Sequence, residues 1–452
     1  MEQAFGNLLG KYDVQGPRYT SYPTALSLSE DFSQPRIIQA LTEHAGPLSL
    51  YVHLPFCHKL CYYCGCNRVI TRHQEKADEY LNFLEKEMQN YSAYTQKNPI
   101  QALHLGGGTP TFLTEQQLSR LMDMLRRHFR FEPARALEVS IEIDPRSCSL
   151  EKLAHLRSLG FNRVSYGVQD INEATQIAIN RVQPLSLVQA HVTKARELGF
   201  ESINLDLVYG LPLQTPTTFA QAVEAVIKLA PERVSLFSYA HLPTRFAAQR
   251  KIPTEMLPQG KEKLALMLNA AHRFQAAGYQ FIGMDHFAKP SDSLAKAQRS
   301  GELQRNFQGY TTHGTNSLLG LGVSSISQVN GIIWQHEKEL STWRKAIAKV
   351  QLPIAKAVAL SADDVIRGDL IADLICHFRL DIDAFAHKWQ IDFHEYFANS
   401  LPNLYAMEAD GLIELTPKAI QVTELGRWFV RVICGNFDAY LNPLRERFSK
   451  VV

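Results

Sequence analysis

The sequence lacks any long apolar run. No stretch approaches the roughly 18–20 apolar residues that a helix needs to cross a bilayer. Residues 1–7 (MEQAFGN) also lack the cationic stretch followed by an apolar one that marks a secretory signal. We therefore expect a cytoplasmic protein that contacts no membrane.

The sequence also lacks an excess of either charge. Its 47 Lys and Arg residues nearly cancel its 45 Asp and Glu residues, which leaves a formal net charge of +2. That balance disfavours a general binder of nucleic acid or of anionic membranes, because both attract strongly basic proteins. It also gives no reason to expect more than a monomer.

Cysteine is scarce and unevenly placed. An odd total of seven, in a chain without an export signal, does not fit a disulfide scaffold. Four of the seven fall within residues 57–66, which indicates metal-binding or redox chemistry in that segment. We expect the widely scattered Cys148, Cys376 and Cys434 to be ordinary buried side chains.

From residue 48, short apolar runs alternate with amphipathic helical patterns. Thr114 and Ser149 stand where helix caps are expected, and Gly160 and Gly199 stand where helices end. This alternation implies an α/β fold with parallel strands and right-handed crossovers. The expected strands are 49–56, 102–105, 137–143, 163–168, 202–208 and 233–239, with a later one at 279–284; the expected helices are 78–94, 114–130, 150–159, 186–198, 216–229 and 261–277.

Six strand–helix units predict a partial, TIM-like (βα)6 barrel, since a complete eight-unit barrel takes about 250 residues. A doubly wound open sheet is the competing arrangement, and the pattern alone does not separate the two. In both arrangements the ligand site lies at the carboxyl ends of the strands.

The two ends of the chain differ from its middle. Residues 1–45 show no strand–helix alternation and predict an extended N-terminal arm. Residues 46–345 hold the barrel and its extension, and residues 346–452 form a mainly helical C-terminal domain of the 452-residue chain. In that last part, helices at 362–380, 383–390 and 393–408, a hairpin at 411–415 and 420–423 and a final helix from about 424 resemble a winged-helix module.

The sharpest motif is C-x3-C-x2-C, formed by Cys57, Cys61 and Cys64 directly after the first predicted strand. Three thiolates on one short loop can hold three irons of a [4Fe–4S] cluster and leave the fourth iron open, whereas ferredoxin-type clusters use four cysteines. A zinc knuckle is the alternative, but zinc sites usually pair this unit with a distant second one. The sequence contains no such second pair.

A glycine triplet, Gly106 to Gly108, follows the second predicted strand and precedes Thr109. Glycine lets a backbone approach a ligand closely and exposes amide donors to an anionic group. A tight strand-to-helix turn is the simpler explanation of the triplet alone. Polar residues near the ends of the later strands also predict a lined cavity, because a strand buried on both faces should be almost wholly apolar; they are Glu142, Asp144, Gln169, Asp170, Asp206, Tyr239 and His241.

The cysteine motif after the first strand of a βα barrel resembles the signature of the radical S-adenosylmethionine (SAM) superfamily. That resemblance implies that SAM chelates the open iron and that its reductive cleavage gives a 5′-deoxyadenosyl radical, with the protein supplying binding and orientation. The glycine triplet is similar to the superfamily's GGE-type motif, which binds the amino group of SAM. Here Thr109 replaces the acidic residue, which leaves backbone groups as the expected contacts.

Further segments resemble one family over nearly the whole chain, that of the oxygen-independent coproporphyrinogen III oxidases. The resemblance implies hydrogen abstraction from the β-carbon of a propionate, then loss of CO2 and of one electron to an acceptor. Two propionates of coproporphyrinogen III become vinyl groups in this way, which gives protoporphyrinogen IX in anaerobic haem synthesis. The matching segments are GPRYTSYPTA (16–25), CGCN (64–67), NLDLVYGLP (204–212), YAHLP (239–243), GMDHFA (283–288) and NFQGYTT (306–312).

The resemblance also implies roles for single residues. Cys66 matches a fourth cysteine that is associated with activity but does not ligate the cluster. An electron donor such as flavodoxin or ferredoxin is implied as a partner. Tyr51, Tyr63, Gly107, Gly108, Thr109 and Glu142 are implied contacts of the SAM on the cluster, and Gln169, Arg181, Asp206, Ala240 and Ile326 fall on positions of a second SAM site.

Two other functions are compatible with parts of the sequence, a haem-binding chaperone and a nucleic-acid-binding regulator. Haem-binding chaperones resemble this family around the three cysteines, but they typically lack both Cys66 of the CGC segment and the GPRYTSYPTA arm, which are present here. A nucleic-acid-binding regulator is hinted at only by the winged-helix-like tail. Its helix at 393–408 carries acidic residues and no Lys or Arg, so we expect no nucleic-acid partner.

Overall fold

The computed structural model describes residues 8–314, 317–444, 446 and 448. The chain packs into two units that alternate along the sequence. Unit 1 consists of Met1–Ser27, Gln280–Gly314 and Leu360–Val452, and unit 2 consists of Leu28–Tyr279 and Thr315–Ala359. The predicted division at residues 45 and 345 into arm, barrel and C-terminal domain stays a prediction.

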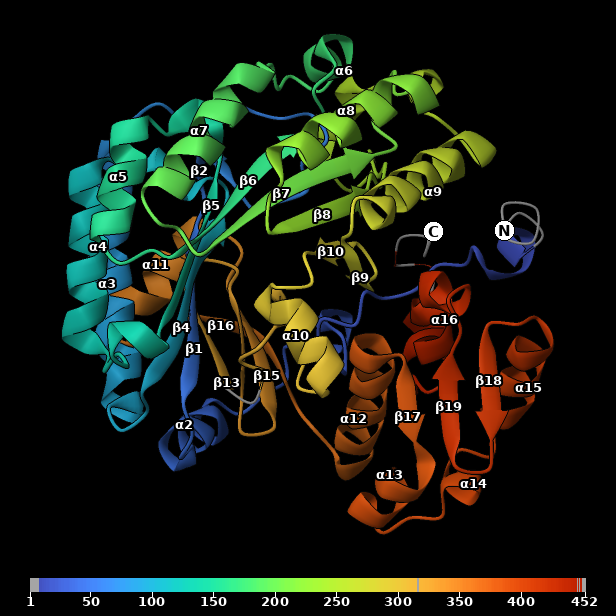
Figure 1. Ribbon diagram of the computed structural model, residues 1–452. Coiled ribbons are helices and arrows are strands. Elements are labelled where there is room, and N and C mark those ends of the chain that lie inside the picture. The colour runs from blue at the N-terminus through green and yellow to red at the C-terminus, as the bar shows by residue number, and fades with distance from the viewer. Residues whose placement is uncertain (1–7, 315–316, 445, 447, 449–452) are drawn as a thin grey trace. The chain divides into compact units, whose positions relative to one another are not determined.

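The six predicted parallel strands are confirmed in unit 2 (Figure 1). Their pairings are all parallel, and each strand lies beside the next one in chain order. On the first strand Leu50 and Val52, which share one face, are wholly buried, and Ser49 and His53 on the other face are buried too, as expected for a parallel sheet covered on both faces. The strands are β1 (Leu48–Leu54), β4 (Ile100–Gly107), β5 (Glu138–Ile143), β6 (Arg163–Gln169), β7 (Ser202–Tyr209) and β8 (Arg233–Ser238).

Helices follow the strands where the apolar periodicity predicts them. Thr114 accepts a hydrogen bond from the backbone of Gln117 at 3.2 Å, and the Gln117 side chain accepts one from the backbone of Thr114 at 3.0 Å, which completes a capping box. Ser149 caps the next helix through Lys152. The helices are α3 (Glu75–Thr95), α4 (Glu115–His128), α5 (Leu150–Ser158), α6 (Glu173–Ala178), α7 (Leu185–Glu197), α8 (Pro216–Leu229) and α9 (Lys261–Ala276).

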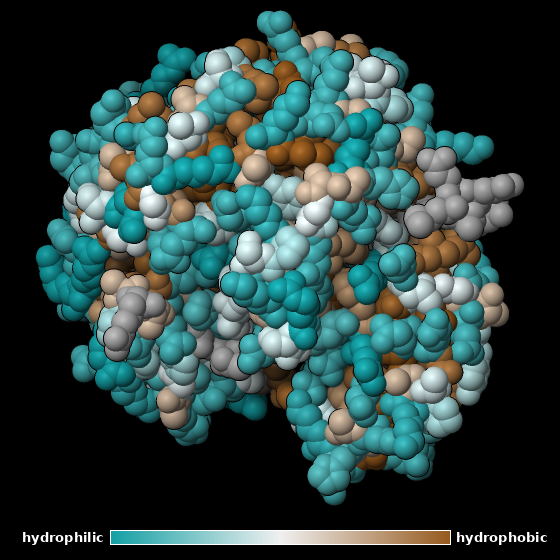
Figure 2. All heavy atoms as spheres, in the orientation of Figure 1, coloured by the Kyte–Doolittle hydropathy of each residue, from teal (hydrophilic) through white to brown (hydrophobic). Residues whose placement is uncertain are grey.

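Helices α3, α4, α5 and α7 stand side by side along the strands (Figure 1). Hydrophilic residues cover most of the outer face over α3, α4 and α5 (Figure 2). Apolar residues such as Leu84 and Leu121 point inward from this row and are wholly buried. The row is therefore amphipathic, which is what the sequence pattern predicts for helices that cover a sheet.

Unit 2 contains one feature that the sequence did not predict, a second group of strands beyond β1. The first of them pairs parallel with β1, as at Leu50 and Leu319, and the others continue in antiparallel order. The order within the unit is β16-β15-β14-β13-β1-β4-β5-β6-β7-β8. This order does not return to its first strand, so the described strands of unit 2 do not form a closed barrel; the partial (βα)6 barrel stays a prediction in its details. The added elements are β13 (Ser317–Leu321), β14 (Ile326–Val329), β15 (Ile332–His336), α11 (Leu340–Ala348) and β16 (Ile354–Ala359).

Unit 1 contains the winged-helix-like module. A three-stranded antiparallel sheet of order β17-β19-β18 lies among helices, and Leu380 pairs with Ile420 in it. The N-terminal segment packs within this unit, where Arg431 donates to the carbonyl of Pro17 at 2.9 Å. The elements are β9 (Gln280–Gly283), β10 (His286–Ala288), α10 (Ser293–Ser300), β11 (Gln304–Asn306), β12 (Gly309–Thr311), α12 (Ala362–His377), β17 (Arg379–Asp381), α13 (Ile382–Trp389), α14 (Phe393–Tyr396), α15 (Leu401–Ala409), β18 (Ile413–Thr416), β19 (Ala419–Val422), α16 (Val430–Gly435) and α17 (Leu441–Leu444).

Three predicted elements differ from the structure. The helix predicted at 393–408 is two helices, α14 and α15, because Pro402 can occupy only the first turn of a new helix. The final helix from 424 is a 3-10 turn, Gly426–Phe429, followed by α16 and α17. The arm is not wholly extended, since helix α2 (Gln34–Glu43) lies within residues 1–45.

Candidate active site

A cavity of about 420 Å³ lies at the carboxyl ends of the parallel strands of unit 2. This is the edge at which ligand sites of βα folds are expected. Among the described residues that line it are all the predicted site residues except Tyr51 and Ile326. These are Cys57, Cys61, Cys64, Cys66, Tyr63, Gly107, Gly108, Thr109, Glu142, Gln169, Arg181, Asp206 and Ala240.

The cysteine loop follows β1 and begins in a short strand, β2 (Phe56–Cys57), which pairs with β3 (Val69–Ile70). Sγ of Cys57 lies 3.3 Å from the hydroxyl of Thr109, and the backbone amide of Cys66 donates to Sγ of Cys64 at 3.4 Å. Burial raises the pKa of Cys57 to about 11, whereas the hydrogen bond with Cys66 lowers the pKa of Cys64 to about 6. The loop therefore holds thiols in two different electrostatic settings.

The donor set fits an iron–sulfur cluster. Among the described residues no group of three His, Cys, Asp or Glu side chains could hold one metal ion. Thiolates that ligate a [4Fe–4S] cluster each bind a different iron, so they need not converge on one point. Cys57, Cys61 and Cys64 line a single cavity in this way. Cys66 lines the same cavity, and the remaining three cysteines are buried outside its lining, with Cys148 5% exposed and Cys376 and Cys434 wholly buried.

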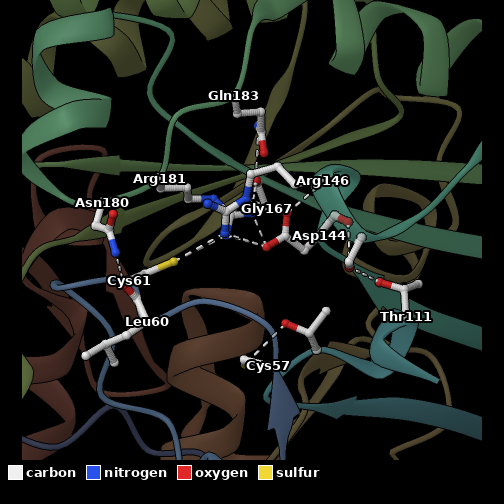
Figure 3. A network of polar contacts seen from close by, with 12 residues as sticks. Cys57, Leu60, Cys61, Thr111, Asp144, Arg146, Gly167, Asn180, Arg181 and Gln183 are labelled. Atoms are coloured by element: carbon white, nitrogen blue, oxygen red, sulfur yellow. Dashed lines mark hydrogen bonds and ion pairs between the residues drawn. The ribbon is translucent and has the colours of Figure 1, made fainter. Parts of the chain in front are cut away.

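A buried charged network lies beside Cys61 (Figure 3). Nη1 of Arg181 donates to Oδ2 of Asp144 at 3.0 Å and lies 3.6 Å from Sγ of Cys61. Arg146 also donates to Asp144, at 2.7 Å, and lies 3.5 Å from the same sulfur. Burial alone would raise the pKa of Asp144, but the two guanidinium groups hold it at about 2. Positive charge is thus directed at the cysteine loop.

The glycine triplet brings the ends of β1 and β4 into contact. A Cβ on Gly108 would lie 2.7 Å from the carbonyl oxygen of Pro55, so no side chain fits there. Gly107 has φ of 120°, a conformation that favours glycine, and its amide donates to Glu142 at 3.3 Å. The triplet is therefore more than a turn, because it forms part of the cavity wall beside the cysteine loop.

A polar group on β6 and β7 forms another part of the wall. The hydroxyl of Ser165 donates to Asp206 at 3.2 Å, and Asn204 donates to it at 2.7 Å. Burial raises the pKa of Asp206 to about 6. Gln169, at the end of β6, has φ of 68°, which is uncommon for a residue with a side chain and turns the chain at the cavity rim.

The other polar strand endings have local roles. Asp170 accepts from the amide of Asn172 at 2.8 Å and from the side chain of Gln214 at 2.6 Å, so it orders the turn after β6. The hydroxyl of Tyr239, which lines the cavity, lies 2.9 Å from Nδ1 of His241.

Sequence reasoning missed two residues that connect the site. Nδ1 of His53 lies 3.1 Å from the hydroxyl of Tyr51, and its Nε2 lies 3.0 Å from the carbonyl oxygen of Asn67. Gln249 donates to the carbonyl of Tyr63 at 2.9 Å. A histidine within an apolar strand was a visible signal for the first, whereas the sequence around Gln249 held none.

Family models match two parts of the chain. Residues 51–226, which include the parallel strands β4–β7 and the cysteine loop, match the model of the radical SAM superfamily. Residues 360–429 match a model described as the HemN C-terminal domain. The first matched range lies within unit 2 and the second lies within unit 1.

Full-length relatives are more specific. The oxygen-independent coproporphyrinogen III oxidase of Salmonella typhimurium is 49% identical over 98% of both chains, and that of Pseudomonas aeruginosa is 46% identical over 99% of this chain and 98% of its own. A solved coproporphyrinogen III oxidase of Escherichia coli, described as a radical SAM enzyme, superposes with a TM-score of 0.92 at 48% identity, covering 95% of this chain and all of that one. This chain belongs to the family of oxygen-independent coproporphyrinogen III oxidases.

Proposed function

We propose that this protein is an oxygen-independent coproporphyrinogen III oxidase of haem biosynthesis. It oxidatively decarboxylates two propionate side chains of coproporphyrinogen III to vinyl groups and releases protoporphyrinogen IX. The observation that carries this function is one cavity lined by Cys57, Cys61, Cys64 and the glycine triplet, in a chain with full-length relatives of that name.

The cofactors are a [4Fe–4S] cluster and SAM. When bound, they supply the one-electron chemistry that removes a hydrogen atom from the β-carbon of a propionate. Cys57, Cys61 and Cys64 hold the cluster. Gly107 and Gly108 have no side chains, so their backbone groups are accessible to the SAM that the cluster binds. Tyr63, Thr109 and Glu142 complete that first SAM site, and Tyr51 belongs to it through His53 rather than by lining the cavity.

A second SAM molecule is part of the proposal. Gln169, Arg181, Asp206 and Ala240 line the same cavity and supply both a guanidinium and a carboxyl group. The guanidinium of Arg181 already donates to Asp144 and to the carbonyl of Gly167, so it offers a carboxylate ligand its positive charge rather than a free pair of donors. Ile326 is the remaining position of that site, at the start of β14.

Cys66 is proposed as a catalytic residue rather than a cluster ligand. It lines the cavity next to Cys64, and the contact with Cys64 raises the pKa of its own thiol well above the usual value. A thiol that keeps its proton in this position can act there as a general acid.

The test is an anaerobic assay of the reconstituted protein with SAM, a reductant and coproporphyrinogen III. We expect CO2 and a product with two vinyl groups. Stoichiometric haem binding without either product would replace the enzyme by the alternative, a haem-binding chaperone. The relatives described above are named oxidases, which favours the enzyme.

We further propose that the protein works as a monomer in the cytoplasm and takes electrons from a flavodoxin or a ferredoxin. All seven cysteines are free thiols, and an iron–sulfur cluster on thiolates fits a reducing compartment. Among the described residues no helix is both long and apolar enough to cross a membrane.

A further inference from the structure

Two segments of unit 2, one that contains the cysteine loop and one that packs on it, carry only positive charge. Neither 57–74 nor 239–254 contains Asp or Glu, although basic and acidic residues nearly cancel over the chain. The positive charge is therefore concentrated here. The segments contribute Arg68 and the exposed Lys59, Arg72, Arg245, Arg250 and Lys251.

The second segment packs directly on the cysteine loop. The ammonium group of Lys251 lies 4.9 Å from the ring centroid of Tyr62, and Gln249 donates to the carbonyl of Tyr63 at 2.9 Å. These contacts hold Lys251 against the loop that carries the proposed cluster ligands. Its charge is thus fixed beside the loop and still exposed to solvent.

Arg245 is placed in the same way. Its guanidinium lies 5.5 Å from the ring centroid of Phe246, and that ring covers Gly65, whose Cβ would lie 3.1 Å from it. Gly65 stands between Cys64 and Cys66 in the loop. Arg245 is therefore separated from the loop by a single ring.

Only some of the basic residues in these two segments line the cavity. Lys59 and Arg68 line it, but Arg245, Arg250 and Lys251 are not among the described residues that do. Lys59 and Arg68 can therefore meet an anionic group inside the cavity. The other three cations are free to meet a partner outside it.

Two exposed apolar side chains lie on another segment that contacts the cysteine loop. Ile177 is 59% exposed and Val182 is 54% exposed, and the segment between them is tied to the loop because the amide of Tyr62 donates to the carbonyl of Ile179 at 3.0 Å. Protein–protein interfaces combine exposed apolar side chains with charged ones, and both kinds contact the cysteine loop through Tyr62 or its neighbours.

We propose that Ile177, Val182, Arg245, Arg250 and Lys251 form a docking surface for an acidic one-electron donor protein, a flavin or iron–sulfur protein. The inference rests on the proposed function, since the cluster must receive one electron for each SAM that is cleaved. The donor is oxidised by one electron and the cluster is reduced by one, with no bond of the protein made or broken. Docking at this surface places the donor directly over the cysteine loop, which keeps the transfer distance short.

The test compares two charge-reversed holoenzymes with two reductants. Arg245→Glu with Lys251→Glu changes the docking surface, and Arg130→Glu with Lys228→Glu is the matched control. The control residues are exposed at the opposite edge, since Arg130 lies between α4 and β5, where its carbonyl accepts from the first residue of β4, and Lys228 lies in the last turn of α8 before β8. Each variant is assayed for CO2 release with reduced flavodoxin and, separately, with dithionite, a small reductant that needs no docking.

With flavodoxin at low salt, we expect the docking-surface variant to lose about ten-fold in rate relative to the wild type and the control variant. Added salt should slow the flavodoxin-driven wild type and leave the variant little changed. With dithionite, all three proteins should agree within about two-fold and retain equal iron, because their cavities are intact.

Equal flavodoxin-driven rates in the wild type and the docking-surface variant would overturn the proposal. A parallel loss with dithionite would also overturn it, by assigning these cations to substrate binding or cluster assembly. Failure of the proposed function itself is a different result, namely a wild type that releases no CO2 with dithionite.

Discussion

Nη1 of Arg181 lies 3.6 Å from Sγ of Cys61, although the two residues are 120 positions apart in the chain. The same nitrogen donates to Asp144, and Arg181 is only 6% exposed. A buried guanidinium needs a carboxylate partner, and here that partner also aligns it with the cysteine loop. The network therefore links the loop after β1 to the loops after β5 and β6.

Replacing Asp144 by Asn should destabilise the protein in a pH-dependent way. The folded-state pKa of about 2 lies below the ordinary value of 3.8, so the carboxylate contributes stability that is present above the ordinary pKa and lost as the pH falls toward 2. At about pH 7 the variant should lose about 2 kcal/mol, a difference that shrinks below about pH 4. Thermal unfolding of both proteins across this range measures it.

The control for this experiment is Asp123→Asn, an exposed carboxylate on α4. It should change stability by less than about 0.5 kcal/mol. A deficit of Asp144→Asn that does not depend on pH would contradict the ion-pair account.

The cysteines should fall into three classes by iron content and activity. Cys61→Ser should lose the brown absorbance and most of the iron, because the proposed cluster loses a ligand. Cys66→Ser should keep iron and lose activity, and Cys148→Ser, which is buried outside the cavity lining, should keep both. Iron analysis, the visible spectrum and the CO2 assay distinguish the classes. Full iron in Cys61→Ser would remove Cys61 from the ligand set.

Adding one methyl group to the glycine triplet should abolish SAM binding. In Gly108→Ala the new Cβ meets main-chain atoms of Pro55 at 2.7 Å, so the ends of β1 and β4 must separate. A displacement of a reacting group by about 1 Å costs about 100-fold in rate. The matched change is Gly368→Ala in α12, whose Cβ meets nothing closer than 3.6 Å. The affinity for SAM and the rate of CO2 release should fall in Gly108→Ala and not in Gly368→Ala. Wild-type affinity and rate in Gly108→Ala would contradict the close approach of the two strand ends.

Asp206→Asn should stabilise the protein at neutral pH. Burial raises the folded-state pKa of Asp206 to about 6, above its ordinary 3.8, so its stabilising contribution is complete below the ordinary pKa and is lost as the pH rises through 6. The uncharged variant avoids that loss, with a gain of up to about 3 kcal/mol above about pH 7 and almost none near pH 4. Melting curves at both pH values test this, and an equal effect at both would refute it.

Much of the fold could be predicted because its signals are local. The apolar run of each parallel strand and the periodicity of each helix stand in one short window, and Thr114 with Gln117 completes a capping box within four residues. The prediction of one helix at 393–408 was wrong for a local reason as well, because Pro402 interrupts a helix that the surrounding apolar pattern would otherwise continue. The strands β13–β16 were not predicted because β13 pairs with β1, which lies more than 260 residues earlier in the chain, and no local pattern contains that pairing.

The sequence by itself determined the chemistry of the site. Three cysteines at fixed spacing after a strand specify thiolates on one loop, and a glycine triplet specifies a wall without side chains, since both depend only on neighbouring residues. The tertiary structure alone decided that Arg181 and Arg146 share Asp144 beside Cys61, and that Lys251 lies against Tyr62. Those contacts depend on the order of strands in the sheet and on the paths of the loops between them. No short window of sequence contains that information.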